Sequence, residues 1–243
     1  MRTHLFSIGR LFGVPIKLDA TWFVAAVLVG GVGWNMIPGR PWMSVVTVVL
    51  LYSSLVAHEF AHIFVGRKMG LEIKEIILSI LGATAYFEGG EGTGGAVLAA
   101  AGPAFSLVLA ALLAGTTAVT MEFARTTDLL QDLLGSIFAL GTVMNVMIAA
   151  FNLLPVYPLD GGRILHAGLL RMTGSHLKAI TISAGLTVTA ALAIIGWSEW
   201  NLIVKHEGGG LLRILAAVVL GGQALGAYRT ELKRSKKGAE KAA

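Results

Sequence analysis

Long apolar stretches are the feature that most constrains how this chain can fold. Six of them approach the roughly 17–25 residues that an α-helix needs to cross a hydrocarbon core of about 30 Å, at residues 20–36, 43–65, 96–119, 129–154, 177–197 and 211–228. Hydrophobic residues make up 55% of the 243 positions and charged residues 14%, whereas soluble proteins average about 45–50% and about 25%. The sequence therefore predicts an all-α polytopic membrane protein with about six transmembrane helices.

Basic residues are distributed unequally over the segments that connect these spans. If both termini lie in the cytoplasm, 15 of the 19 Lys and Arg residues face inward, as the positive-inside rule requires. We therefore predict an integral membrane protein, assigned to a prokaryotic plasma membrane, with both termini cytoplasmic. Residues 1–228 would form the six-span core, and residues 229–243 a basic cytoplasmic tail attracted to anionic lipid.

The net charge of +5 agrees with this topology, since Lys and Arg beside apolar spans usually set membrane orientation. We expect the lipid bilayer as a partner and no nucleic acid. The oligomeric state stays open.

Two segments outside the spans carry distinct patterns. Residues 71–90 are too short and interrupted to cross the bilayer, and their β-branched and aromatic residues end at a glycine cluster, which predicts a short β hairpin between spans two and three. The alternative is an interfacial amphipathic helix. The first twenty residues mix basic and apolar side chains, unlike a removable signal peptide. We expect this arm to lie at the membrane surface, the alternative being a solvated arm.

The second span contains the sequence HEFAH. His58 and His62 are four residues apart, so on a helix they share one face, while Glu59 is rotated by about 100° and can reach a water on the metal. This spacing is the HExxH pattern of zinc peptidases. A carboxylate within a span costs about 2.5–3.5 kcal/mol on insertion scales, which favours a task for Glu59 over the alternative of a structural His–Glu pair.

A catalytic zinc usually takes three protein ligands, and the chain has no cysteine. Asp160 follows the fourth span in the sequence NLLPVYPLDGG. Pro155 and Pro158 break the helix before it, and Gly161 and Gly162 allow close backbone approach after it. We therefore predict Asp160 as the third ligand, the alternative being a helix N-cap.

Together, HEFAH and NLLPVYPLDGG resemble the site-2 protease family of intramembrane zinc metalloproteases, over nearly the whole chain. The resemblance implies a six-span core in which His58, His62 and Asp160 bind one Zn²⁺ and Glu59 is the general base. It also implies that Asn152 contacts substrate near the metal. The alternative for Asn152 is a hydrogen bond between helices.

The same resemblance implies that the strand-like segment holds substrate in extended form by strand addition. The residues predicted to bind substrate there are Gly82, Ala83, Thr84, Ala85, Tyr86 and Phe87.

For two further positions we expect a role in packing. The third span carries Ser106 where the family's GPxxN-like motif has Asn, so we expect Gly102 and Ser106 to permit close helix packing. His166 follows Asp160 by six residues; we expect a packed histidine, the alternative being support of a zinc ligand from behind.

These residues predict an enzyme, a zinc metalloendopeptidase that cleaves the transmembrane segments of membrane-tethered regulatory proteins in regulated intramembrane proteolysis. Its partner would be a membrane-spanning protein substrate. One alternative is a metal-ion transporter, since ionisable residues in spans also mark ion pathways, although paired binding segments in two repeated halves are not visible. Another is a non-catalytic membrane-protein binder, which the complete HEFAH motif disfavours.

Overall fold

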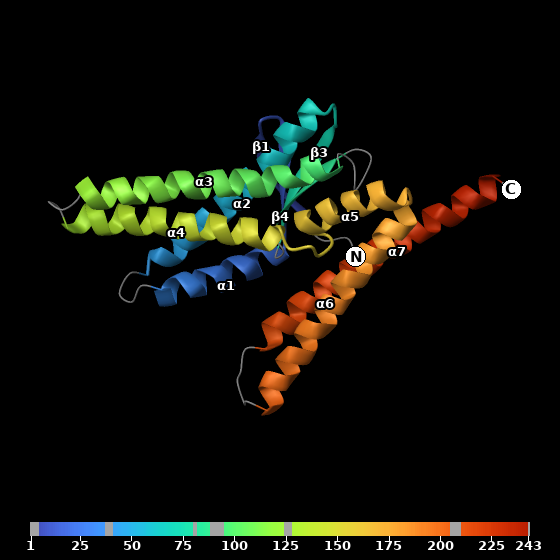
Figure 1. Cartoon of the computed structure of the whole chain (residues 1–243). Helices are drawn as coiled ribbons and strands as arrows, with labels where there is room; N and C mark the ends of the chain where they lie inside the picture. Colours follow the sequence, from blue (N-terminus) through green and yellow to red (C-terminus); the bar gives the residue numbers. More distant parts are fainter. Residues whose placement is uncertain are drawn as a thin grey trace. The chain divides into compact units, whose positions relative to one another are not determined.

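The computed structural model describes residues 5–36, 41–79, 82–87, 95–123, 128–204 and 210–242 (Figure 1). Its elements follow one another as β1 (Leu5–Leu11), β2 (Val14–Asp19), α1 (Thr21–Met36), α2 (Met43–Lys68), β3 (Ile73–Ser79), β4 (Gly82–Phe87), α3 (Gly95–Phe123), α4 (Asp128–Asn152), α5 (Asp160–Thr173), α6 (His176–Val204) and α7 (Gly210–Ala242). The chain divides into two compact units. The first comprises Met1–Gly94 and Ala100–Phe151, and the second Gly95–Ala99 and Asn152–Ala243.

The first unit contains a four-stranded sheet in the order β1-β2-β3-β4. Pairing is antiparallel between β1 and β2, parallel between β2 and β3, and antiparallel between β3 and β4. Val14, Ile16, Ile76 and Leu78 are buried, as alternation along a half-buried strand requires. Among the described residues β4 pairs only with β3, so its other edge is not covered by a strand.

Helix α2 is the centre of the first unit. It contacts β3 and β4. Helix α1 crosses α2 closely, because a Cβ added at Gly33 of α1 would lie only 2.5 Å from Oγ1 of Thr47 in α2. The end of α2 is defined by Gly70, whose positive φ of 77° places the chain in a left-handed turn with the Leu71 N–H bonded to the Gly66 carbonyl. This C-terminal motif satisfies backbone carbonyls that would otherwise lack partners.

Helices α3 and α4 complete the first unit beside α2. A Cβ at Gly141 of α4 would lie 3.1 Å from Leu113 of α3. The Asn145 amide of α4 donates to Oγ of Ser54 in α2 at 3.0 Å, and Asn145 is fully buried. This polar contact joins α4 to α2 one helical turn before His58.

The second unit consists mainly of α5, α6 and α7. Helices α6 and α7 run side by side (Figure 1) and are close enough that a Cβ at Gly221 would lie 3.5 Å from Ala191. Helix α5 packs on α6 and ends at Gly174, which has a φ of 64° and whose N–H bonds to the Leu170 carbonyl. The segment predicted as a basic tail continues α7 as helix to Ala242.

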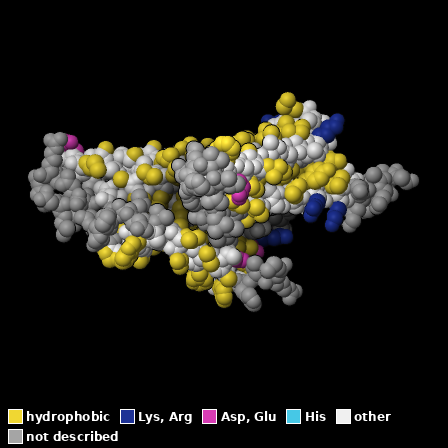
Figure 2. All heavy atoms as spheres, turned by 90° about the horizontal axis from the view of Figure 1, so that it is seen from below, with side chains coloured by type: hydrophobic (Ala, Val, Ile, Leu, Met, Phe, Trp, Pro, Cys, Tyr) yellow, Lys and Arg dark blue, Asp and Glu magenta, His cyan; other side chains and the backbone are white. Residues whose placement is uncertain are grey.

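Four helices are long and apolar enough to cross a membrane among the described residues, and they lie at Met43–Lys68, Gly95–Glu122, Leu134–Asn152 and His176–Asn201. They correspond to the predicted spans two to five. Figure 2 shows hydrophobic side chains spread over much of one described face. The chain is thus an integral membrane protein. The first and sixth predicted spans, at residues 20–36 and 211–228, are not among these four helices and stay predictions.

The sheet confirms the predicted hairpin and includes two N-terminal strands that were not predicted. The hairpin between the second and third spans exists as β3 and β4, so the alternative of an amphipathic helix is wrong. The N-terminal arm, for which no strand was predicted, forms β1 and β2, and β2 joins the hairpin through its parallel pairing with β3. The sequence did not reveal that β2 joins the hairpin, because its partner strand β3 lies about 60 residues away in sequence.

Candidate metal centre

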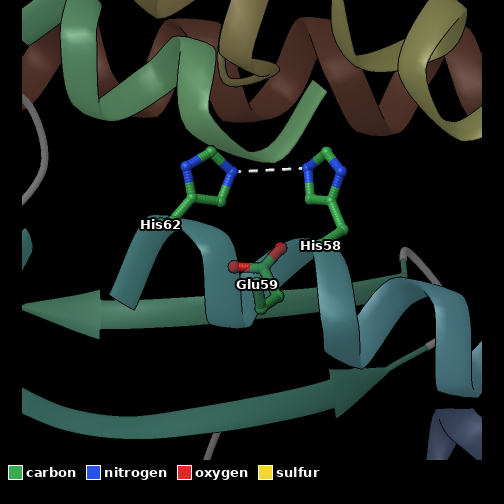
Figure 3. Close-up of side chains that lie close together, drawn as sticks. All are labelled: His58, Glu59 and His62. Carbon is green, nitrogen blue, oxygen red and sulfur yellow. Dashed lines mark hydrogen bonds between the residues drawn. The ribbon is translucent and has the colours of Figure 1, made fainter. Parts of the chain in front are cut away.

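The two histidines of HEFAH face one another on α2. Their Nε2 atoms are 3.3 Å apart, and the ring centroids are separated by 5.0 Å. Both side chains are buried, at 1% and 2% exposure for His58 and His62. Figure 3 shows both imidazoles projecting from the same side of α2. The four-residue spacing in a regular helix is sufficient to produce this arrangement.

The geometry of this pair fits a metal ion. Two nitrogens that bind one tetrahedral zinc at about 2.0–2.1 Å would lie about 3.3–3.4 Å apart, which matches the observed separation. Ligand atoms of His58, Glu59 and His62 all lie within 4.8 Å of one another. Among the described residues this is the one group of three or more such side chains close enough to hold an ion.

Glu59 lies on the side of α2 that faces the sheet. In Figure 3 its carboxylate lies between the two imidazoles and the strands. The backbone N–H of Ala85 in β4 donates to Oε2 of Glu59 at 2.9 Å, and Glu59 is only 9% exposed. The carboxylate is therefore held between the histidine pair and the edge strand, where a hydrogen bond to its charged form stabilises the anion.

Helix α3 covers the histidines from the opposite side. Oγ of Ser106 lies 3.0 Å from Nδ1 of His58, and Ser106 is fully buried. A Cβ at Gly102 would lie 2.3 Å from Nε2 of His62 and 2.4 Å from Nε2 of His58. The absence of a side chain at Gly102 is therefore what lets α3 approach the imidazoles.

Asp160 belongs to the second unit and is the first residue of α5. Its carboxylate is 5% exposed and lies 3.6 Å from the Arg163 guanidinium. The N-cap of α5 is Leu159, with no side-chain capping bond, so the N-cap alternative for Asp160 is wrong.

The loop before Asp160 packs tightly against the first turn of α5. A Cβ at Gly161 would lie 2.2 Å from the Leu153 carbonyl oxygen, and one at Gly162 would lie 2.5 Å from the Tyr157 nitrogen. The Tyr157 N–H donates to Oγ1 of Thr187 at 2.8 Å, which ties the loop to α6. The prediction that these two glycines permit close backbone approach is confirmed.

The remaining predicted site residues lie in two places. Asn152 is the last residue of α4 and is partly exposed. Gly82, Ala83, Thr84, Ala85, Tyr86 and Phe87 are the six residues of β4. The structure brings this strand to Glu59 through Ala85, a contact that the sequence pattern did not predict.

His166 lies in the second unit beside His176, with ring centroids 6.2 Å apart. Burial lowers the pKa of His166, and the nearby His176 lowers it further, whereas Glu231 and the backbone of Ala179 raise it. This environment favours a neutral imidazole.

A model described as peptidase family M50 matches residues 46–196, which include HEFAH and Asp160. The chain is 35% identical over 189 residues to a Synechocystis protein provisionally named a zinc metalloprotease, covering 73% of this chain and 47% of that protein. It is 29% identical over 203 residues to a zinc metalloprotease of Methanocaldococcus jannaschii, covering 83% and 56%. This chain spans about half the length of these relatives.

A solved structure with a similar fold is the site-2 protease from Methanocaldococcus jannaschii. The TM-score is 0.65 at 25% sequence identity, and the match covers 93% of this chain and 95% of that one. The likeness therefore extends over both units.

Proposed function

The chain belongs to peptidase family M50, the site-2 protease family, and on that premise we propose that it is an intramembrane zinc endopeptidase. Its substrates would be the transmembrane segments of membrane-tethered regulatory proteins. The observation that carries the proposal is the buried pair of Nε2 atoms 3.3 Å apart, with Glu59 beside them, on a helix apolar enough to cross a membrane.

The zinc ligands in this proposal are His58, His62 and Asp160. Two imidazoles and one carboxylate are a ligand set that leaves the fourth position of a catalytic zinc open. Asp160 is supported by its burial and by the close packing of the preceding loop against Gly161 and Gly162, where no side chain fits. When bound, zinc supplies Lewis-acid polarisation of the scissile carbonyl and lowers the pKa of a water.

Glu59 is the general base. Its carboxylate takes a proton from the attacking water and later passes that proton to the leaving amine. The hydrogen bond from the Ala85 N–H fixes the orientation of this carboxylate beside the metal site. The peptide bond that breaks then yields a carboxylate and an amine.

Substrate binds along β4. The edge of β4 is not paired with another strand among the described residues, and an extended peptide can add there through backbone hydrogen bonds. Strand addition also compensates a helical substrate for the internal hydrogen bonds it loses on unwinding. Asn152 contacts the substrate near the metal, as the family resemblance implies.

The proposed topology places both termini in the cytoplasm of a prokaryotic cell, with six spans and the basic segment from residue 229 at the inner surface. The unequal distribution of Lys and Arg supports this orientation. Water reaches the site from the cytoplasmic side, so the cut falls in the cytoplasmic half of the substrate helix.

The test is the Glu59→Gln variant, co-expressed with a single-span membrane substrate. We expect zinc content to stay near one per chain and cleavage to disappear, because the amide cannot accept the proton. The matched control is Glu199→Gln, which removes an exposed carboxylate from α6 and should leave cleavage unchanged.

Three outcomes would contradict the proposed function. Undiminished cleavage in Glu59→Gln would remove the protease assignment. Zinc that crosses the membrane in reconstituted vesicles, with no cleavage by the unmodified chain, would indicate a transporter. Stable capture of membrane proteins without cleavage would indicate a binder.

A further inference from the structure

We propose that Ser106 is a positioning residue that holds His58 with its proton on Nδ1, so that Nε2 is available to the metal. This inference rests on the proposed zinc site. It gives Ser106 a role beyond the close helix packing that the sequence predicts. It starts from the 3.0 Å contact between Oγ of Ser106 and Nδ1 of His58, which joins α3 to α2 across 48 positions of sequence.

The chemistry of imidazole makes this contact consequential. A neutral imidazole carries one N–H and one lone pair, and only the lone pair can bind a metal. The Nε2 atoms of His58 and His62 face one another at 3.3 Å, so both must present lone pairs when they share an ion. The proton of His58 must then sit on Nδ1, and this N–H donates a hydrogen bond to the Ser106 hydroxyl oxygen.

Burial makes an acceptor at this position necessary. His58 is 1% exposed and Ser106 is fully buried, so bulk water does not solvate the Nδ1–H. A buried donor without a partner costs free energy. Removing the hydroxyl would therefore destabilise the tautomer of His58 that binds the metal. Ligating histidines in general donate their second nitrogen to such a partner, and removing it typically weakens metal affinity about 10–100-fold.

Gly102 is what brings Ser106 into range. The two residues are four apart on α3 and therefore share the face directed at the histidines. Since a Cβ at Gly102 would come within 2.4 Å of both Nε2 atoms, any larger residue there would displace α3 or enter the space between the nitrogens. Gly102 thus lets α3 approach the imidazoles closely, and Ser106 then provides the hydrogen-bond acceptor.

The experiment measures zinc affinity of the purified full chain in detergent by competition with a chelator. We expect Ser106→Ala to weaken zinc binding about 10–100-fold, and Ser106→Thr, which keeps the hydroxyl, to restore most of it. The control Thr116→Ala removes a hydroxyl from an exposed position on the same helix, where it bonds only to the Leu112 carbonyl, and should bind zinc as the unmodified chain does.

A second readout separates positioning from folding. Cobalt(II) bound in place of zinc should show a changed visible absorption spectrum in Ser106→Ala and an unchanged one in Thr116→Ala, while both apo proteins melt within a few degrees of the unmodified apo chain. Gly102→Ala should lose zinc binding, whereas Gly115→Ala, whose added Cβ meets nothing within 4 Å, should keep it.

The outcomes distinguish this inference from the function on which it rests. Unaltered zinc affinity and cobalt spectrum in Ser106→Ala, with one zinc bound by the unmodified chain, would overturn the role of Ser106 and leave the proposed function standing. An unmodified chain that binds no zinc would overturn the proposed function itself.

Discussion

At the scale of single residues, Asp160 is the proposed zinc ligand that mutation can test most directly. It is buried at the start of α5. The backbone of the preceding loop leaves no room for a side chain at Gly161 or Gly162. Asp160 also lies 3.6 Å from Arg163. These two observations correspond to two roles, metal ligation and a local ion pair, and mutation can separate them.

We expect Asp160→Ala to lower zinc affinity by more than the 10–100-fold typical of residues that only support a ligand, because a ligand itself is lost. Zinc content after dialysis against a chelator measures this. The matched control is Arg163→Ala, which removes the ion pair and leaves the carboxylate. If Arg163→Ala lost as much zinc as Asp160→Ala, the ion pair and not ligation would explain the effect.

At the scale of elements, β4 has two proposed roles: it contacts Glu59 of α2, and it binds the substrate. The Ala85 N–H bonds the Glu59 carboxylate, so it is not used in the ladder to β3. Alternation along a strand directs the Ala83 N–H to the same edge. In the proposed mechanism the Ala85 N–H orients the base, and the Ala83 N–H would bind a substrate strand.

Proline substitution tests this division, because proline removes an N–H and is tolerated where that N–H points away from the ladder. We expect Ala85→Pro to lower kcat about ten- to hundredfold, which is the value of a hydrogen bond to a charged group, about 1.5–3 kcal/mol. We expect Ala83→Pro to raise KM with little change in kcat. Steady-state kinetics with a fluorescent transmembrane substrate measures both.

The zinc content and melting temperature of the two proline variants provide the control. Both should remain near those of the unmodified chain, since no ladder bond is removed. Equal losses of kcat in both variants would contradict separate roles for the two donors.

At the scale of the whole molecule, the membrane topology remains to be tested. Four helices are long and apolar enough to span among the described residues, and the six-span orientation rests on the distribution of basic residues. The chain has no cysteine, so single introduced cysteines report on topology without any background.

We expect a membrane-impermeant maleimide to label Arg125→Cys in intact cells, because the proposed topology puts this position, which follows the third span, on the outer side. Ser235→Cys, in the basic C-terminal segment, should be labelled only after the cells are opened. The reverse pattern would invert the orientation and place the basic segment outside. Cleavage activity of both variants should match that of the unmodified chain.

The sequence by itself determined the features that depend on local spacing. The four-residue interval of His58 and His62 places two imidazoles on one face of any helix, and the lengths of the apolar runs predict spans two to five. The β-branched and aromatic residues of the hairpin predicted β3 and β4. These patterns repeat within a few residues, so the polypeptide geometry fixes their outcome wherever the element is formed.

Only the tertiary structure decided which elements meet. The contacts of Ser106 with His58 and of Ala85 with Glu59 join residues 48 and 26 positions apart, and β2 pairs with β3 across the whole of α1 and α2. No periodicity encodes such pairs, because they depend on how closely two backbones can approach. At Gly102 that approach requires the absence of a side chain, a property that a single glycine in an apolar helix does not reveal until its neighbours are in place.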